Sequence, residues 1–191
     1  VPGDSSAEQS GATRLCALAV DPGGIPAAAV PTRAHLAGYA ALRLSGVPSH
    51  RLREALRGQL LVARRNAAGE LSALTGVQIA GMIDDLYAGA RQATLGVTWH
   101  GDAPAVALWA PTARQVRIEV AGTGASAGTG ASAGAAVGAA TPTAGPGAPR
   151  TTTYLMARDE LGIWHASGTP AWKNASYLFE VEVVDPVAGA V

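Results

Sequence analysis

The sequence predicts an all-β protein in which an antiparallel β-sandwich follows a smaller β-rich domain. Its apolar runs are short, and each ends at a cluster of Gly, Pro or Asp residues, which is typical of strands joined by tight turns. Seven of the nine aromatic residues lie between positions 99 and 179, which indicates that the second half contains the larger core. Gly and Pro supply 24 and 12 of the 191 residues, a high share for a single compact domain.

The first domain is expected to span residues 1–93. Apolar runs bounded by turn residues predict two strands, a short helical turn capped by Ser49, and then a hairpin of two further strands. A short helix or loop follows and leads to a boundary near Gly89. In chain order the predicted segments are 12–20, 37–44, 49–57, 58–66, 70–79 and 80–88.

The second domain, residues 94–191, shows the clearer strand pattern. Residues 115–120 (QVRIEV) alternate polar and apolar side chains, as a half-buried strand does. In the last run, Tyr177, Phe179, Val181 and Val183 alternate with more polar positions, so we expect them to share one face. The predicted strands are 94–100, 105–111, 115–120, 152–159, 163–168 and 177–185. Their short, even spacing predicts a β-sandwich.

Residues 121–149 interrupt this pattern. They contain 11 Ala, 8 Gly and 3 Pro and no charged or aromatic residue, and GTGASAG occurs at 122–128 and again at 128–134. Such a segment buries too little apolar surface to offset the entropy lost on ordering. We therefore predict a disordered Ala/Gly-rich insertion between two strands of the sandwich.

The charge balance excludes some classes of partner. The 14 basic and 14 acidic residues cancel, which argues against a nucleic-acid or anionic-membrane binder, and no apolar run reaches the length of a transmembrane helix. The N-terminal residues do not fit a signal peptide. Five arginines form a mild basic cluster: Arg51, Arg53, Arg57, Arg64 and Arg65. We interpret this cluster as a solvated face of the protein. The alternative is that it binds an acidic surface of a partner.

The sequence predicts no metal site, cofactor or catalytic residue. His35, His50, His100 and His165 have no spacing typical of metal ligands, and the single cysteine, Cys16, lies in an apolar run and is interpreted as a small buried hydrophobe. Residues 124–128 (GASAG) match a nucleophile-elbow pattern, but no helix pattern or triad partners follow. An enzyme would need a buried acid–base pair that the sequence does not reveal.

Trp172, Lys173 and Asn174 are the best candidates for a binding site. An indole face stacks on the apolar face of a sugar ring, and an amine and an amide beside it can bond to hydroxyl groups. These residues lie on a predicted turn before the last strand. Trp172 could equally be a core residue, and that alternative stays open. Trp109 and Trp164 lie inside strand-like runs and are expected in the core.

Several of these segments resemble a known family. LWAPTARQVRIEV and GIWHASGTPAWKNASYLFEVEVVDPVAGAV are similar to the family 48 carbohydrate-binding module that precedes the catalytic barrel in glycoside hydrolase family 13. Upstream, HLAGYAALRL and GVQIAGMIDDLYA resemble the N-terminal region of bacterial pullulanase-type α-1,6-glucosidases, which are starch debranching enzymes. The resemblance covers about 15–120 and 150–191 and breaks at the insertion.

The resemblance implies an immunoglobulin-like sandwich, incomplete at its C-terminus, in a non-catalytic accessory region. That region would brace a catalytic barrel, which is its expected partner, and would bind α-glucan (pullulan, starch or glycogen dextrins) through Trp172 and Lys173. The resemblance also implies an extracellular or cell-surface bacterial protein. The alternative is a purely structural packing module without sugar affinity.

Overall fold

The computed structural model describes residues 15–27, 31, 34–36, 38–121, 141–143, 151–185 and 189–190. The chain divides into two compact units, residues 1–48 and 49–191, and each is described by itself. The domain boundary expected at residue 93 stays a prediction.

The first unit contains a small antiparallel ribbon. Its elements are β1 (Leu18–Val20), the 3₁₀ helix η1 (Ala34–Leu36) and β2 (Leu42–Leu44), with β1 paired to β2. The carboxylate of Asp21 accepts a hydrogen bond from the Gly23 N–H at 3.0 Å and forms an ion pair with Arg43 at 2.6 Å. Both predicted strands are therefore confirmed in shortened form. Cys16 is exposed, so its interpretation as a buried hydrophobe is wrong.

The second unit begins with helices and a hairpin. Its first elements are α1 (Ser49–Ala55), β3 (Leu61–Arg65), β4 (Leu71–Gly76), α2 (Ala80–Leu86) and the 3₁₀ helix η2 (Ala88–Gln92). The predicted hairpin is confirmed, because β3 pairs with β4 in antiparallel register. The side chain of Asn66 orders the turn by accepting hydrogen bonds from the backbone N–H groups of Ala68 and Glu70 at 3.0 and 2.9 Å.

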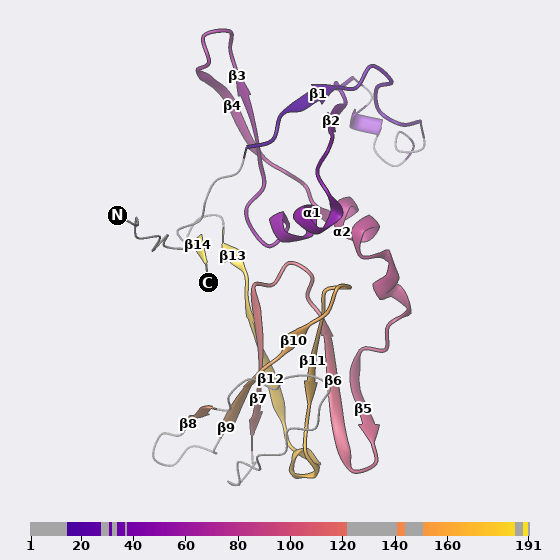
Figure 1. Ribbon diagram of the computed structural model, residues 1–191, viewed down its shortest axis with the longest axis vertical. Coiled ribbons are helices and arrows are strands. Elements are labelled where there is room, and N and C mark those ends of the chain that lie inside the picture. The colour runs from indigo at the N-terminus through magenta and orange to yellow at the C-terminus, as the bar shows by residue number, and fades with distance from the viewer. Residues whose placement is uncertain are drawn as a thin grey trace, which may run out of the picture. The chain divides into compact units, whose positions relative to one another are not determined.

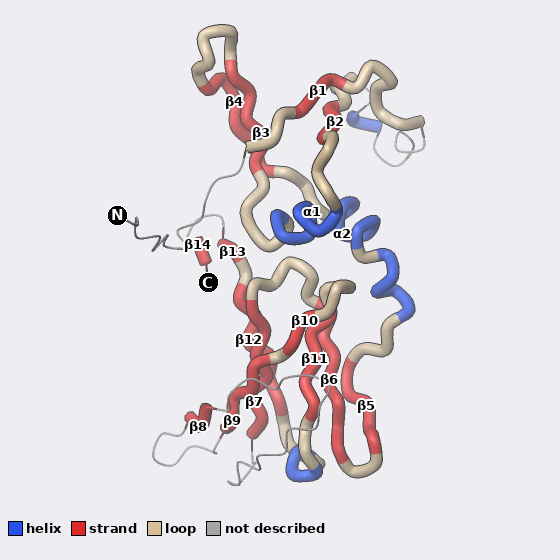
Figure 2. The backbone as a smooth tube through the Cα atoms, viewed as in Figure 1, coloured by secondary structure: helices blue, strands red, loops and turns tan. Residues whose placement is uncertain are grey.

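Two four-stranded antiparallel sheets form the rest of this unit (Figures 1 and 2). The first sheet has the order β10–β11–β6–β5, from Ala157–Arg158, Ile163–Ser167, Ala103–Trp109 and Gly96–His100. The second has the order β12–β7–β9–β8, from Tyr177–Glu182, Gln115–Ala121, Thr151–Leu155 and Thr141–Thr143. The 3₁₀ helix η3 (Pro170–Trp172) precedes β12, and β13 (Val184–Asp185) pairs with β14 (Gly189–Ala190).

The core joins the two sheets and identifies the arrangement as a β-sandwich. The second sheet contributes Val116, Ile118 and Val120 of β7, all at most 1% exposed, and the first contributes residues such as Val106 and Trp164. The predicted alternation of β7 is confirmed, because its intervening residues are only partly buried. The all-β fold class expected from the sequence is therefore correct.

The register of β12 agrees with its predicted alternation. Tyr177, Phe179 and Val181 pair with Val120, Ile118 and Val116, respectively, and paired residues of neighbouring strands share a face of the sheet. Leu178, on the opposite face, is 71% exposed.

Most of the predicted insertion, including the GASAG motif at 124–128, lies outside the described residues. Two described parts of it belong to strands, contrary to the expectation of disorder. Ala121 is the last residue of β7, and β8 pairs with β9 so that Pro142 lies opposite Thr152. Within the described parts of the chain, no helix has the length and apolar character needed to cross a membrane.

Candidate functional site

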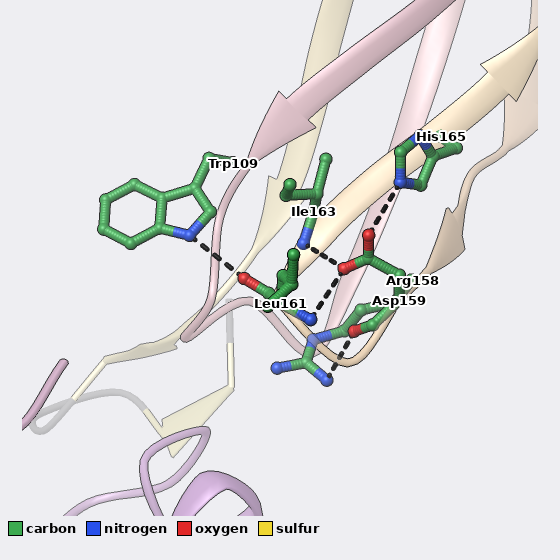
Figure 3. A network of polar contacts seen from close by, with 6 residues as sticks. All are labelled: Trp109, Arg158, Asp159, Leu161, Ile163 and His165. Carbon is green, nitrogen blue, oxygen red and sulfur yellow. Dashed lines mark hydrogen bonds and ion pairs between the residues drawn. The ribbon is translucent and has the colours of Figure 1, made fainter. Parts of the chain in front are cut away.

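A polar network holds the turn between β10 and β11 (Figure 3). The Oδ1 atom of Asp159 accepts hydrogen bonds from the backbone N–H groups of Leu161 and Ile163, both at 2.9 Å. Its Oδ2 atom lies 3.0 Å from Nε2 of His165 on β11. One carboxylate therefore orders the turn and holds the imidazole across it.

Gly162 is required at this turn for two reasons. Its φ angle is +73°, which is a strained conformation for residues with a Cβ. A Cβ atom at this position would also lie 2.8 Å from the Cα and Cβ atoms of Pro111. Any other residue at this position would therefore strain the backbone and crowd Pro111.

The network keeps the Asp159 carboxylate charged. Burial alone would raise the pKa of Asp159, but hydrogen bonds from His165 and from the backbone N–H groups of Ile163 and Leu161 outweigh burial. The pKa of Asp159 is therefore below its ordinary value. The side chains of His165 and Asp159 are 43% and 37% exposed, so solvent reaches both and screens their interaction.

Trp109 is tied to the same turn. Its indole N–H donates a hydrogen bond to the carbonyl of Leu161 at 3.2 Å, and its side chain remains 37% exposed. Trp109 is therefore exposed, and its expected core position is wrong. Trp164 does lie in the core, where it is 5% exposed and donates to the carbonyl of Ala110 at 2.9 Å.

A groove of about 590 Å³ lies along this sheet beside the network. The strand register places Thr98, Ala105 and Ser167 in one row and Ala107, Ala157 and His165 in the next. All six residues line the groove, together with Asp159 and His100. The small alanine side chains thus leave space between hydroxyl, imidazole and carboxylate groups. Such a combination of donors and acceptors can form hydrogen bonds with a neutral polyhydroxyl ligand.

The predicted stacking residue Trp172 lies in the core. It is 7% exposed, and its ring centroid is 4.9 Å from that of Tyr154. Gly168 lies against the ring, because a Cβ there would come within 2.6 Å of it. This placement corresponds to the alternative in which Trp172 is a core residue, and its indole is not an exposed platform for a sugar.

Lys173 and Asn174 differ from Trp172 because both are exposed. The Lys173 Nζ atom lies 3.7 Å from the Asp102 Oδ1 atom, and both side chains are more than 60% exposed (62% and 79%). Asn174 has a φ angle of +63°, a left-handed conformation that Asn tolerates better than most residues. The three predicted residues therefore form no joint platform, and sugar contact at Lys173 and Asn174 stays a prediction.

Sequence reasoning missed the Asp159–His165 pair. The signal that could have found it is the Glu160-Leu161-Gly162 turn, because strand pairing across this turn makes residues 157 and 165 neighbours. No group of three or more His, Cys, Asp or Glu side chains that could hold a metal occurs among the described residues.

Comparison with known proteins identifies the chain's relatives. Residues 3–85 match the model of the Pullulanase N2 domain. The chain is 23% identical over 170 residues to "Pullulanase 1, chloroplastic" of Arabidopsis thaliana, covering 88% of this chain and 15% of that protein. The chain therefore spans about a seventh of that relative's length.

Solved structures agree with this match. The pullulanase of Klebsiella pneumoniae complexed with maltotriose superposes with a TM-score of 0.70 at 25% identity, over 94% of this chain and 15% of that one. PulA from Klebsiella oxytoca has the same fold, with a TM-score of 0.66 at 24% identity over 90% of this chain and 14% of that one. Over most of its length, the chain is therefore similar to a region of pullulanases that includes the N2 domain.

Proposed function

We propose that these 191 residues form a non-catalytic accessory region of a starch and pullulan debranching enzyme. The similarity extends over 88% of this chain but only 15% of the plant pullulanase, which supports a role as one region of a larger hydrolase. Hydrolysis of α-1,6-glucosidic linkages, the chemistry of glycoside hydrolase family 13, would belong to a catalytic barrel outside these residues.

The test of the non-catalytic role is a reducing-end assay with pullulan. The purified chain is expected to release no new reducing ends above the buffer blank, whereas a complete pullulanase in the same assay releases them. Turnover by the chain alone, retained through two further chromatographic steps, would overturn this part of the proposal.

The role that the geometry supports best is bracing of the barrel by a family 48-type sandwich. The second unit has a continuous core in which Ile118, Val116 and Trp172 are at most 7% exposed, and such a core supplies a firm surface for a neighbouring domain. Bracing of the barrel is part of the accessory role that the family resemblance implies.

The test uses a pullulanase-type enzyme that carries these 191 residues in place of its own N-terminal region. Removal of the region is expected to accelerate thermal inactivation of debranching activity. Trp172→Ala should reproduce part of that loss, because it weakens the brace without touching the barrel. Equal inactivation rates in all three proteins would remove the bracing role.

Binding of α-glucan is the second candidate function, supported by the groove beside Asp159 and His165. The groove combines imidazole, carboxylate and hydroxyl groups, and the similar Klebsiella pneumoniae pullulanase was crystallised with maltotriose. The turn at Lys173 and Asn174 is the competing location predicted from the sequence.

Affinity electrophoresis in gels containing amylopectin separates these locations. If the groove holds glucan, amylopectin should retard the chain, Ala107→Tyr should abolish the retardation by filling the floor, and Lys173→Ala should not. Leu178→Tyr, which adds an aromatic ring on the opposite sheet, is the matched control. Unchanged mobility of the unmodified chain would leave only the structural role.

A further inference from the structure

A second pocket, which shares Arg158 with the lining of the groove, lies beside α1. It has a volume of about 280 Å³ and is lined by Arg53, Arg57, Arg158, His50, Glu54 and Glu160. We propose that this pocket binds a small oxyanion, namely a phosphate group that is either free or carried on a sugar. The proposal goes beyond the accessory role above and does not depend on it.

Tyr87 fixes two of the three guanidinium groups. The guanidinium carbons of Arg53 and Arg158 lie 5.6 and 5.9 Å from the centroid of its ring, within the range of a cation–π interaction. The Nη2 atom of Arg158 also donates to the Tyr87 hydroxyl at 3.0 Å. Because Tyr87 is only 1% exposed, the two guanidinium groups are held in place before any ligand arrives, which lowers the entropic cost of binding.

The hydrogen bonds described for the three arginines go to neutral acceptors. Arg53 donates to the carbonyl of Leu86 at 3.1 Å, and Arg57 donates from Nε to the carbonyl of Ala113 at 3.0 Å. Arg158 donates to the carbonyl of Pro111 at 3.2 Å as well as to Tyr87. These acceptors orient the guanidinium groups but do not neutralise their charge.

The concentration of positive charge is large enough to affect Arg57. Burial, and next the charge of Arg158, lower the pKa of Arg57. The pocket therefore holds positively charged groups close together in a partly desolvated place, where an anion would be attracted more strongly than at an open surface.

The Nε atoms of Arg53 and Arg158 are buried and lack a hydrogen-bond partner within the described structure, and an unsatisfied buried donor is costly. Guanidinium groups present planar sets of donors that match the oxygens of phosphate. A phosphate group has enough acceptor oxygens to serve more than one arginine.

The two carboxylates of the pocket make it possible to test whether negative charge in the pocket weakens the binding of an anion. Glu54 and Glu160 also line it, and a carboxylate near a bound anion weakens binding by repulsion. Glu160 is exposed, so Glu160→Gln should leave the fold intact. Loss of its charge is expected to tighten phosphate binding.

The experiment is isothermal titration of the 191-residue chain with sodium phosphate, at an ionic strength kept constant with sodium chloride. Arg53→Gln should weaken phosphate binding about 10-fold or more, as expected for loss of hydrogen bonds from a charged group. Glu160→Gln should strengthen it several-fold. Arg64→Gln, which removes the same charge from the exposed β3–β4 hairpin, is the control and should change nothing.

Parallel titration with glucose 6-phosphate separates the two sources of the phosphate group. Equal affinity for both ligands would support a site for the free anion, and tighter binding of glucose 6-phosphate would support a sugar-borne phosphate. Absence of binding heat above the sodium chloride background would overturn the proposal. An equal loss of phosphate affinity in Arg53→Gln and Arg64→Gln would also overturn it. If Arg53→Gln fails to fold, an unchanged phosphate affinity of Glu160→Gln would overturn the proposal instead.

Discussion

The carboxylate of Asp159 lies 3.0 Å from Nε2 of His165 and at the same time accepts two backbone hydrogen bonds in the turn between them. The turn, and through Leu161 the exposed Trp109, are thus held by one acidic side chain. Asp159 and His165 also border the groove that we propose as a glucan site.

Asp159→Ala should destabilise the second unit by about 1–2 kcal/mol at pH 7, because it removes charge-assisted hydrogen bonds at a partly exposed position where solvent screens the charge. Urea denaturation measures the change. Asp102→Ala, which alters an exposed carboxylate that faces Lys173, should cost less than about 0.5 kcal/mol. Equal costs for the two substitutions would contradict the role of the network.

The contribution of Asp159 should depend on pH in a defined direction. Its pKa is lower in the folded protein than the ordinary value of 3.8, so the unfolded chain binds its proton more readily. The stabilisation is therefore present above about pH 4 and is lost as the pH falls through the folded-state pKa. The difference between the unmodified chain and Asp159→Ala should shrink between pH 5 and pH 2, roughly the range of this linkage. A difference that stays constant would contradict it.

Gly162→Ala should destabilise the second unit by about 2–3 kcal/mol, since it combines an unfavourable positive φ angle with the 2.8 Å approach to Pro111. Gly101→Ala is the matched control: its φ angle is +64°, but nothing lies within 4 Å of the added Cβ. It should therefore cost only about 1 kcal/mol. Thermal denaturation of both variants measures the contribution of the contact, and equal melting temperatures would disprove it.

Trp172→Ala should destabilise the sandwich by about 3–5 kcal/mol, the cost typical of deleting a buried aromatic side chain. Lys173→Ala, one residue along the chain, should change stability by less than about 0.5 kcal/mol because its side chain is exposed. Chemical denaturation provides the comparison. A small effect of Trp172→Ala on stability would return this residue to the candidates for sugar contact.

Strands could be predicted from the sequence wherever polar and apolar residues alternate, because this alternation shows which face of the strand is buried. The alternation along Gln115–Val120 identified both β7 and its inward face. Trp172 could not be assigned in this way, because its burial depends on Gly168 and Tyr154, and η3 places it between them. Cys16 was misjudged because an apolar run suggested burial, whereas β1 belongs to a ribbon of only two strands.

The site residues were harder to predict because their partners are distant in sequence. Arg53 and Arg57 are interpreted from the sequence as part of a solvated face, yet both are only partly exposed. The Tyr87 ring lies beside Arg53, and carbonyl groups of the β6–β7 turn accept hydrogen bonds from Arg57. Helical spacing alone shows which residues share a face of α1, but not what that face contacts. Arg51, Arg64 and Arg65 are exposed, as the interpretation expected.

The bracing role is tested most directly by the half-life of debranching activity at elevated temperature. The comparison is between a pullulanase-type enzyme that carries residues 1–191 and the same enzyme without them, assayed on pullulan. We predict a half-life at least several-fold longer with the region present, and an intermediate value for Trp172→Ala. Half-lives that are equal with and without the region would contradict the proposal that it braces the barrel.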